Sequence, residues 1–224
     1  MAKRPQGKTG KSSTKTTAPG DARDAVIDAA MACIARDGWR RLSLADVAAE
    51  AGVPLAGVLI PFPTKYAIVN AFQDRIDAQM LTAADRNATA GEDGTDTRDR
   101  LFDLLMERFD ALAPYRPALA EIAKDALGDP GSLCFVPRMA RTMARVLAAA
   151  GIGTSGIGGM IRAKGLALVY ADAFRVWLGD DSADKSKTMA ALDTALRRAE
   201  KAARVLCPGR RARTAAEQPE SHSA

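Results

Sequence analysis

The sequence predicts an all-α protein, with an N-terminal three-helix unit that contains a helix-turn-helix and a larger helical body behind it. Aromatic residues make up only 5% of the 224 residues, which favours helices over strands. Apolar residues also recur at helical spacing between glycine and proline breaks. The predicted division is a disordered basic tail at 1–20, the helix-turn-helix unit at 21–66, a ligand-binding and dimerisation body at 67–206, and a disordered tail at 207–224.

The clearest run of signals lies between Ser43 and Lys65. Ser43 is followed three residues later by Asp46, so a helix is predicted to start there with the hydroxyl as its cap. Gly52 ends that helix, because glycine tolerates the left-handed backbone conformation. Pro54 then suits the first turn of a second short helix. Two short helices joined by a tight glycine turn predict a helix-turn-helix.

Two further helices flank this motif. The first is predicted from Asp24 to Arg36 and ends at Gly38, with Trp39 expected to pack beneath the motif. The fourth is predicted from about Thr64 to Asn87, and it connects the motif to the body.

This spacing resembles the tetracycline-repressor (TetR) family of transcriptional regulators. The resemblance implies a dimeric, ligand-responsive protein that places the second short helix of its motif in the major groove of DNA. The matching elements are the helix Asp24 to Arg36, the Gly38-Trp39 break, the helix Leu44 to Ala51, the Gly52-Val53 turn, and Phe62 with Lys65.

Contacts to DNA phosphates are expected at the starts of two helices. Arg40, Arg41 and Ser43 precede the second helix, where cations, a hydroxyl and free amides meet. Thr64 and Lys65 open the fourth helix. The alternative is that Ser43 only caps its helix and the basic side chains are ordinary solvated surface.

The reading helix itself is apolar. Its candidate DNA-contacting residues are Leu55, Ala56, Gly57, Leu59 and Ile60. Base edges are normally read by Arg, Lys, Asn, Gln or a hydroxyl, and none of these occurs from Pro54 to Pro61. Methyl contacts, DNA shape and backbone amides remain available, so DNA is predicted as a partner whose recognition is weakened by this helix.

The positive charge is concentrated in the N-terminal tail. Residues 1–20 carry five basic residues and no acid, which equals the net charge of +5 of the whole chain. Residues 21–66 contain five basic and six acidic residues. Phosphate affinity therefore depends on the tail and a few local residues. The tail is either a basic arm on DNA or a solubilising segment.

The body is expected to hold a small apolar or lipid-like ligand. Its predicted helix Arg100–Leu112 has an apolar face with Glu107 and Arg108 outside. The candidate ligand-binding residues are Phe109, Phe135, Met139, Met143, Tyr170 and Phe174. The alternative is that these side chains are ordinary core, which is the commoner outcome at helical spacing.

The last two predicted helices are Ile161–Leu178 and Thr188–Val205. The TetR resemblance implies that they pair with their mates in a second subunit, which makes a homodimer. Ala163, Ala167 and Ala171 are small enough for close approach of two helices.

An enzyme, a metal site and a cofactor are not predicted. The only histidine, His222, lies in the C-terminal tail, outside the body. Asp180 and Asp181 are adjacent carboxylates that are expected at a solvated helix end. Three widely spaced cysteines indicate reduced thiols in a cytoplasmic protein. No apolar run reaches about 18 residues, so no transmembrane helix is predicted.

A second resemblance gives an alternative function. The segments 98–112 and 177–193 are similar to a TetR-fold lipid-binding accessory protein of ubiquinone biosynthesis. This implies a body that holds an isoprenoid or other lipid, without sequence-specific DNA binding. The membrane-associating amphipathic helix of that family has no counterpart after Leu206, where the sequence has no apolar face.

Overall fold

The computed structural model describes residues 19–89, 96–126 and 135–206, and every regular element in these ranges is helical. The all-α prediction is confirmed. The elements are α1 (Pro19–Asp37), α2 (Leu44–Ala51), α3 (Leu55–Leu59), α4 (Lys65–Thr89), α5 (Thr97–Leu112), the 3₁₀ turn η1 (Ala113–Tyr115), α6 (Arg116–Ala126), α7 (Phe135–Ala149), α8 (Gly156–Leu178) and α9 (Ser186–Leu206). None of the helices in these ranges has an apolar stretch long enough to cross a membrane.

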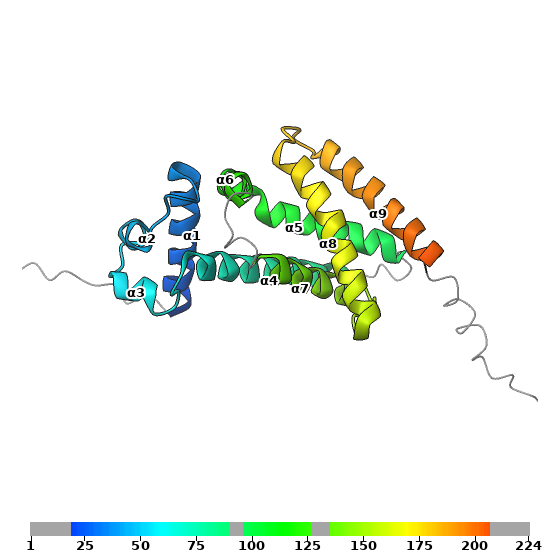
Figure 1. Cartoon of the computed structure of the whole chain (residues 1–224), viewed down its shortest axis with the longest axis horizontal. Coiled ribbons are helices and arrows are strands. Elements are labelled where there is room, and N and C mark those ends of the chain that lie inside the picture. Colours follow the sequence, from blue (N-terminus) through cyan, green and yellow to red (C-terminus); the bar gives the residue numbers. More distant parts are fainter. Residues whose placement is uncertain (1–18, 90–95, 127–134, 207–224) are drawn as a thin grey trace, which may run out of the picture.

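Helices α1 to α3 form a head at one end of the molecule, and α4 leads from the head into the body (Figure 1). Helix α4 packs against α5 and α7, while α8 packs against α7 and α9. The head also contacts the body directly, because α1 packs against α6. Helix α6 therefore touches the head from the side opposite to α2 and α3 (Figure 1).

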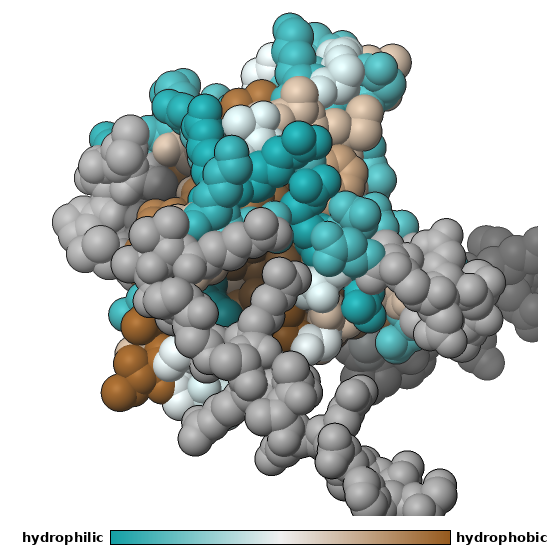
Figure 2. Space-filling view, turned by 90° about the vertical axis from the view of Figure 1, so that its right-hand side faces the viewer, coloured by the Kyte–Doolittle hydropathy of each residue, from teal (hydrophilic) through white to brown (hydrophobic). Residues whose placement is uncertain are grey.

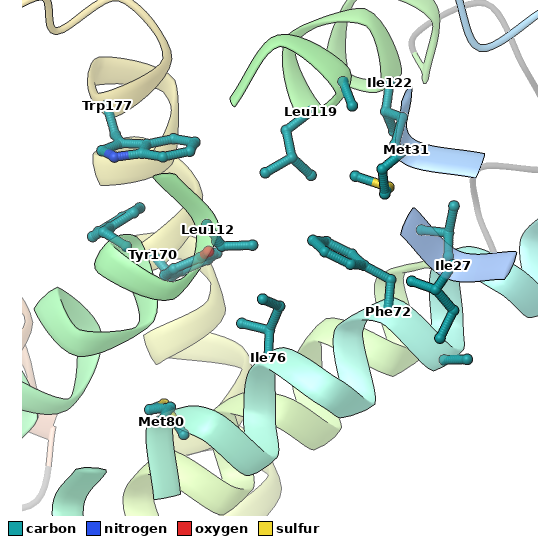
Figure 3. Packing of buried hydrophobic residues seen from close by; sticks show 14 of the residues in the cluster. Ile27, Met31, Phe72, Ile76, Met80, Leu112, Leu119, Ile122, Tyr170 and Trp177 are labelled. Atoms are coloured by element: carbon teal, nitrogen blue, oxygen red, sulfur yellow. The ribbon is translucent and has the colours of Figure 1, made fainter. Parts of the chain in front are cut away.

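One hydrophobic core runs from the head into the body. At the junction, Ile27 from α1 and Phe72 from α4 lie close to Ile122 from α6, and deeper in the body Tyr170 and Trp177 from α8 continue the cluster (Figure 3). The head therefore shares one close-packed core with α4 and α6.

The helix-turn-helix prediction is confirmed by its caps. Ser43 has an extended backbone, and its Oγ accepts a hydrogen bond from the Asp46 amide at 3.1 Å. Gly52 ends α2 with a φ of 64°, where a side chain would be strained. Helix α1 starts at Pro19, earlier than the predicted Asp24 and inside the stretch assigned to the tail. The rest of that tail (1–18), the C-terminal tail from 207 and His222 lie outside the described residues.

The expectation of a solvated helix end at Asp180 is wrong. The Asp180 side chain is buried, and its Oδ2 accepts hydrogen bonds from the amide of Thr188 at 2.9 Å and from its hydroxyl at 2.6 Å. The other oxygen accepts from the amide of Ser182 at 3.1 Å and from its hydroxyl. Asp180 therefore caps the start of α9 from outside the helix. Its neighbour Asp181 is exposed, as expected.

These bonds make the stability of the body sensitive to acid. Hydrogen bonds from the Ser182 and Thr188 hydroxyls hold the pKa of Asp180 well below its usual range. The stabilisation is therefore present above the ordinary Asp pKa of about 3.9 and is lost as the pH falls toward the folded-state value.

We expect Asp180→Asn to lower the free energy of unfolding most at pH 7, with the difference from wild type shrinking below about pH 4. Urea unfolding at both pH values measures this difference. Asp181→Asn is the matched control and is expected to change little at either pH, because Asp181 is exposed. If the difference in free energy of unfolding between wild type and Asp180→Asn were the same at both pH values, the ionised Asp180 carboxylate would not be the stabilising group.

Candidate functional site

The outward face of α3 is aliphatic. Leu55, Leu59 and Ile60 are 45%, 43% and 84% exposed, and Ala56 and Gly57 are exposed as well. Val58 alone points inward, with no exposed surface. Helix α3 lies on the side of the head away from the body (Figure 1). The five predicted reading-helix residues are thus brought together on one accessible surface.

The three residues predicted to contact phosphates around α2 differ in the interactions that they already make within the protein. Arg41 is exposed, next to the start of α2. The Ser43 hydroxyl is used as the cap of α2. Arg40 turns toward the body, because its guanidinium pairs with Asp125 of α6 at 3.4 Å and its amide donates to the same carboxylate at 3.2 Å. Arg41 is therefore the strongest phosphate candidate of the three.

Thr64 and Lys65 at the start of α4 also have internal roles. The Thr64 hydroxyl accepts a hydrogen bond from the Ala67 amide at 3.2 Å, which caps α4. The Lys65 ammonium donates to the Trp39 carbonyl at 3.0 Å and lies 4.3 Å from the centre of the Trp39 ring. Lys65 thereby holds the segment between α1 and α2 against α4, and its contact to DNA stays a prediction.

An open depression beside α2 carries charges of both signs. Its lining residues are Arg36, Asp37, Arg41, Asp46, Ala49 and Glu50. Arg36 pairs with Glu50 at 2.9 Å and with Asp37 at 3.0 Å, and these carboxylates raise the pKa of Arg36. Two of the three acidic side chains are thus paired with Arg36, and the exposed Arg41 is the second cation of the depression.

The predicted ligand residues of the body fall into separate groups. Phe109 of α5 stacks on Tyr170 of α8 with ring centres 5.2 Å apart, and Phe174 lies 5.9 Å from Tyr170. Trp177, which the sequence analysis did not select, completes this stack at 5.5 Å from Phe174. Met143 is fully buried on α7, and Met139 is partly buried.

Phe135 is not part of that stack. It lies 6.2 Å from Trp39 and 5.9 Å from Tyr66, measured between ring centres, so it joins α7 to the head. Trp39 is fully buried, as predicted. Among the candidate residues, Phe135 thus belongs to the head–body junction, and Phe109, Tyr170 and Phe174 belong to the aromatic stack.

A charged cluster centred on the buried residues Asp77 and Arg108 lies between α4, α5 and α7. Arg108 was expected outside, but it has no exposed surface and donates hydrogen bonds to Asp77 and Gln73 of α4. The second oxygen of Asp77 accepts from the Thr142 hydroxyl and the Arg145 guanidinium, both at 2.8 Å. The expectation for Arg108 failed because its partners come from another helix. Burial of an arginine requires such a partner.

This cluster carries more positive than negative charge. Arg138 of α7 pairs with Asp74 at 2.7 Å and with Asp77 at 3.3 Å, so three arginines surround two aspartates. Burial tends to raise the pKa of Asp74, but hydrogen bonds from Arg138 and Arg145 outweigh it and the pKa is lowered. The Nε atoms of Arg108 and Arg138 are buried without a partner among the described residues. The cluster fixes α4, the helix that enters the head, to α5 and α7.

Comparisons with known proteins identify this arrangement. Residues 26–72 match the family model of bacterial regulatory proteins of the tetR family. A TetR transcriptional regulator from Nitrosomonas europaea ATCC 19718 is 26% identical, with a TM-score of 0.64 over 81% of this chain and 99% of that one. This chain has the TetR N-terminal domain and the TetR fold. No curated protein matches the sequence.

Other solved structures share the TetR fold at lower identity. NalD from Pseudomonas aeruginosa, the secondary repressor of the MexAB-OprM multidrug efflux pump, is 20% identical, with a TM-score of 0.51 over 80% of this chain and 96% of NalD. A TetR transcriptional regulator from Rhodococcus sp. RHA1 is 17% identical, with a TM-score of 0.52 over 81% of this chain and 97% of that one. The prediction of a TetR-type transcriptional regulator is therefore confirmed at the level of domain and fold.

Proposed function

We propose that this TetR-type chain binds DNA as a homodimer and places α3 of each head in the major groove. The observation that carries the proposal is the placement of α3. It is the second helix of a capped helix-turn-helix, it is anchored by Val58, and its other side chains are accessible on the side away from the body. A dimer would present two such heads to successive major grooves.

Phosphate binding by Arg41 gives a direct test of this geometry. Duplexes that tile the DNA upstream of the chain's own reading frame are screened first, and the duplex bound most tightly is kept. We expect Arg41→Ala to weaken binding to this duplex and to unrelated duplexes alike. The dependence of log affinity on log salt should also become shallower by about one unit per subunit.

Arg141→Ala is the matched control, because Arg141 is exposed on α7, outside the head and outside the proposed subunit contact. An unchanged salt slope for Arg41→Ala would show that Arg41 does not contact a phosphate. Retention of no duplex, even at low salt, would contradict DNA binding altogether.

The exposed face of α8 supports the homodimer. Ile157, Ile161 and Leu168 are 74%, 62% and 75% exposed and lie on one side of the helix. Apolar residues gather at the lower edge of the face in Figure 2, at the height where α8 begins in Figure 1. Of the three alanines predicted to allow close approach, Ala163 is buried within its own subunit, Ala167 is partly buried and Ala171 is exposed. We therefore place the subunit contact on the Ile161–Leu168 side of α8.

We expect Leu168→Asp to raise the dimer dissociation constant by about 100-fold or more, because a carboxylate would have to be buried without a partner. Sedimentation velocity over a concentration series measures this constant. Val136→Asp is the control, since Val136 is 65% exposed on α7. A wild-type chain that is monomeric at micromolar concentration would contradict the proposed assembly.

The ligand proposed for the body is small and apolar or lipid-like. The support is the aromatic stack of Phe109, Tyr170 and Phe174, with Met139 and Met143 of α7 in the same hydrophobic core. Since α4 and α6 share the core of the head, a ligand that separates α5 from α8 would change the spacing of the two heads. A lipid that copurifies with the chain, together with no retention of DNA at low salt, would favour the lipid-binding alternative.

A further inference from the structure

The aliphatic surface of α3 is small and strongly exposed. Ile60 is 84% exposed, and Leu55 and Leu59 are each more than two-fifths exposed. Three such side chains are far fewer than the 20 to 30 residues, or about 800 Å² per partner, of a stable protein–protein interface. A partner protein is therefore a poor match for this patch alone. A partner surface that presents only a few separate methyl groups matches the α3 patch better than a protein does.

Gly57 supplies an independent observation on the same short helix. Its φ is not positive, and an added Cβ would meet only the Val53 side chain at 3.7 Å or more and Pro54 at 3.9 Å, which is ordinary contact. The fold therefore does not require a glycine here, although glycine destabilises a helix by about 1 kcal/mol relative to alanine. Glycine does permit close approach of another surface to the helix backbone.

In the major groove, the C5-methyl group of thymine is the apolar group that a base pair presents, and alanine-like and aliphatic side chains contact it. We propose that α3 reads thymine methyl groups through Leu55, Leu59 and Ile60, with Gly57 allowing the helix to approach the bases closely. This inference rests on the proposed DNA binding. It specifies that the preferred half-site presents thymines to α3 and that hydrogen bonds to base edges contribute little to its recognition.

The test replaces thymine by uracil, which removes the methyl group and keeps the base-pairing edge and the major-groove acceptor. The full-length chain first selects its preferred duplex from a random library. Each thymine of that duplex is then replaced singly by deoxyuridine, and affinities are measured by fluorescence anisotropy. We expect a loss of about fourfold for each contacted methyl, which corresponds to about 0.8 kcal/mol for one buried methylene-sized group.

The Leu59→Ala variant makes the test specific to α3. At the thymine that Leu59 contacts, the variant should bind the thymine and uracil duplexes equally, while Val136→Ala should keep the full difference. Equal binding of thymine and uracil duplexes by the wild-type chain would overturn methyl readout and leave DNA binding intact. Retention of no library duplex, even at low salt, would instead overturn the proposed DNA binding, and methyl readout with it.

Discussion

Asp77→Asn is expected to lower the free energy of unfolding by about 3 to 5 kcal/mol, because it breaks a buried ion pair on one side only. Asp77 and Arg108 are both almost completely buried, and Arg108 also donates a hydrogen bond to the uncharged Gln73. The substitution keeps the shape of the side chain but leaves the Arg108 charge without its carboxylate. Urea unfolding followed by circular dichroism measures the change.

Two further variants test whether the loss of stability comes from the unpaired charge of Arg108 and from the burial of the ion pair. Asp172→Asn removes a carboxylate that pairs with Arg175 on the exposed surface, and it should cost less than about 1 kcal/mol. Joining Asp77→Leu with Arg108→Met removes both charges together, so the loss should be smaller than the sum of the two single losses. Strict additivity, or a loss for Asp77→Asn as small as that for Asp172→Asn, would show that the pair does not hold α4 to α5.

Trp39→Ala is expected to destabilise the chain by about 3 to 5 kcal/mol and to abolish DNA binding. The Trp39 ring is fully buried, lies edge-on to Tyr66 at 5.3 Å between ring centres, and receives the Lys65 ammonium over its face. Its loss would leave a cavity between the head and α7 and would free the segment that precedes α2. Thermal unfolding and anisotropy with the preferred duplex measure the two effects.

Trp39→Phe keeps most of the ring contacts and is expected to lose less than half as much stability. Val136→Ala is the surface control on α7, next to Phe135. If Trp39→Ala left DNA affinity unchanged at a temperature where the variant is folded, Trp39 would not position the head.

Local signals predicted the head well. Ser43, Gly52 and Gly38 each occupy the capping or helix-ending position that their residue types favour, because these roles depend on neighbours within a few residues. Helical periodicity likewise predicted an apolar face for α5, and Leu104, Leu105 and Phe109 are buried on this helix. Features that are decided within one turn or one helix are therefore readable from sequence.

Long-range partners were not predicted. The position of Arg108 along its helix predicted an exposed side chain. Its burial depends on Asp77, which lies 31 residues earlier. Asp180 was assigned to a solvated end, yet its hydroxyl partner Thr188 lies on the following helix. Phe135 was predicted as a ligand contact because it is aromatic, but its neighbours are Trp39 of the head and Tyr66 of α4. The spacing of residues along one helix does not show which side chains of other helices will face that helix.

We expect a TetR-type head with an apolar reading helix to recognise a specific DNA sequence. The most direct test is the ratio of dissociation constants for a scrambled duplex and for the preferred duplex from the chain's own upstream region, measured with the full-length chain at about 0.15 M salt. We predict a ratio of about 1,000 or more, as for specific DNA-binding proteins. A ratio near one across a salt series, with steeply salt-dependent affinity, would contradict this expectation and show that only the phosphate backbone is bound.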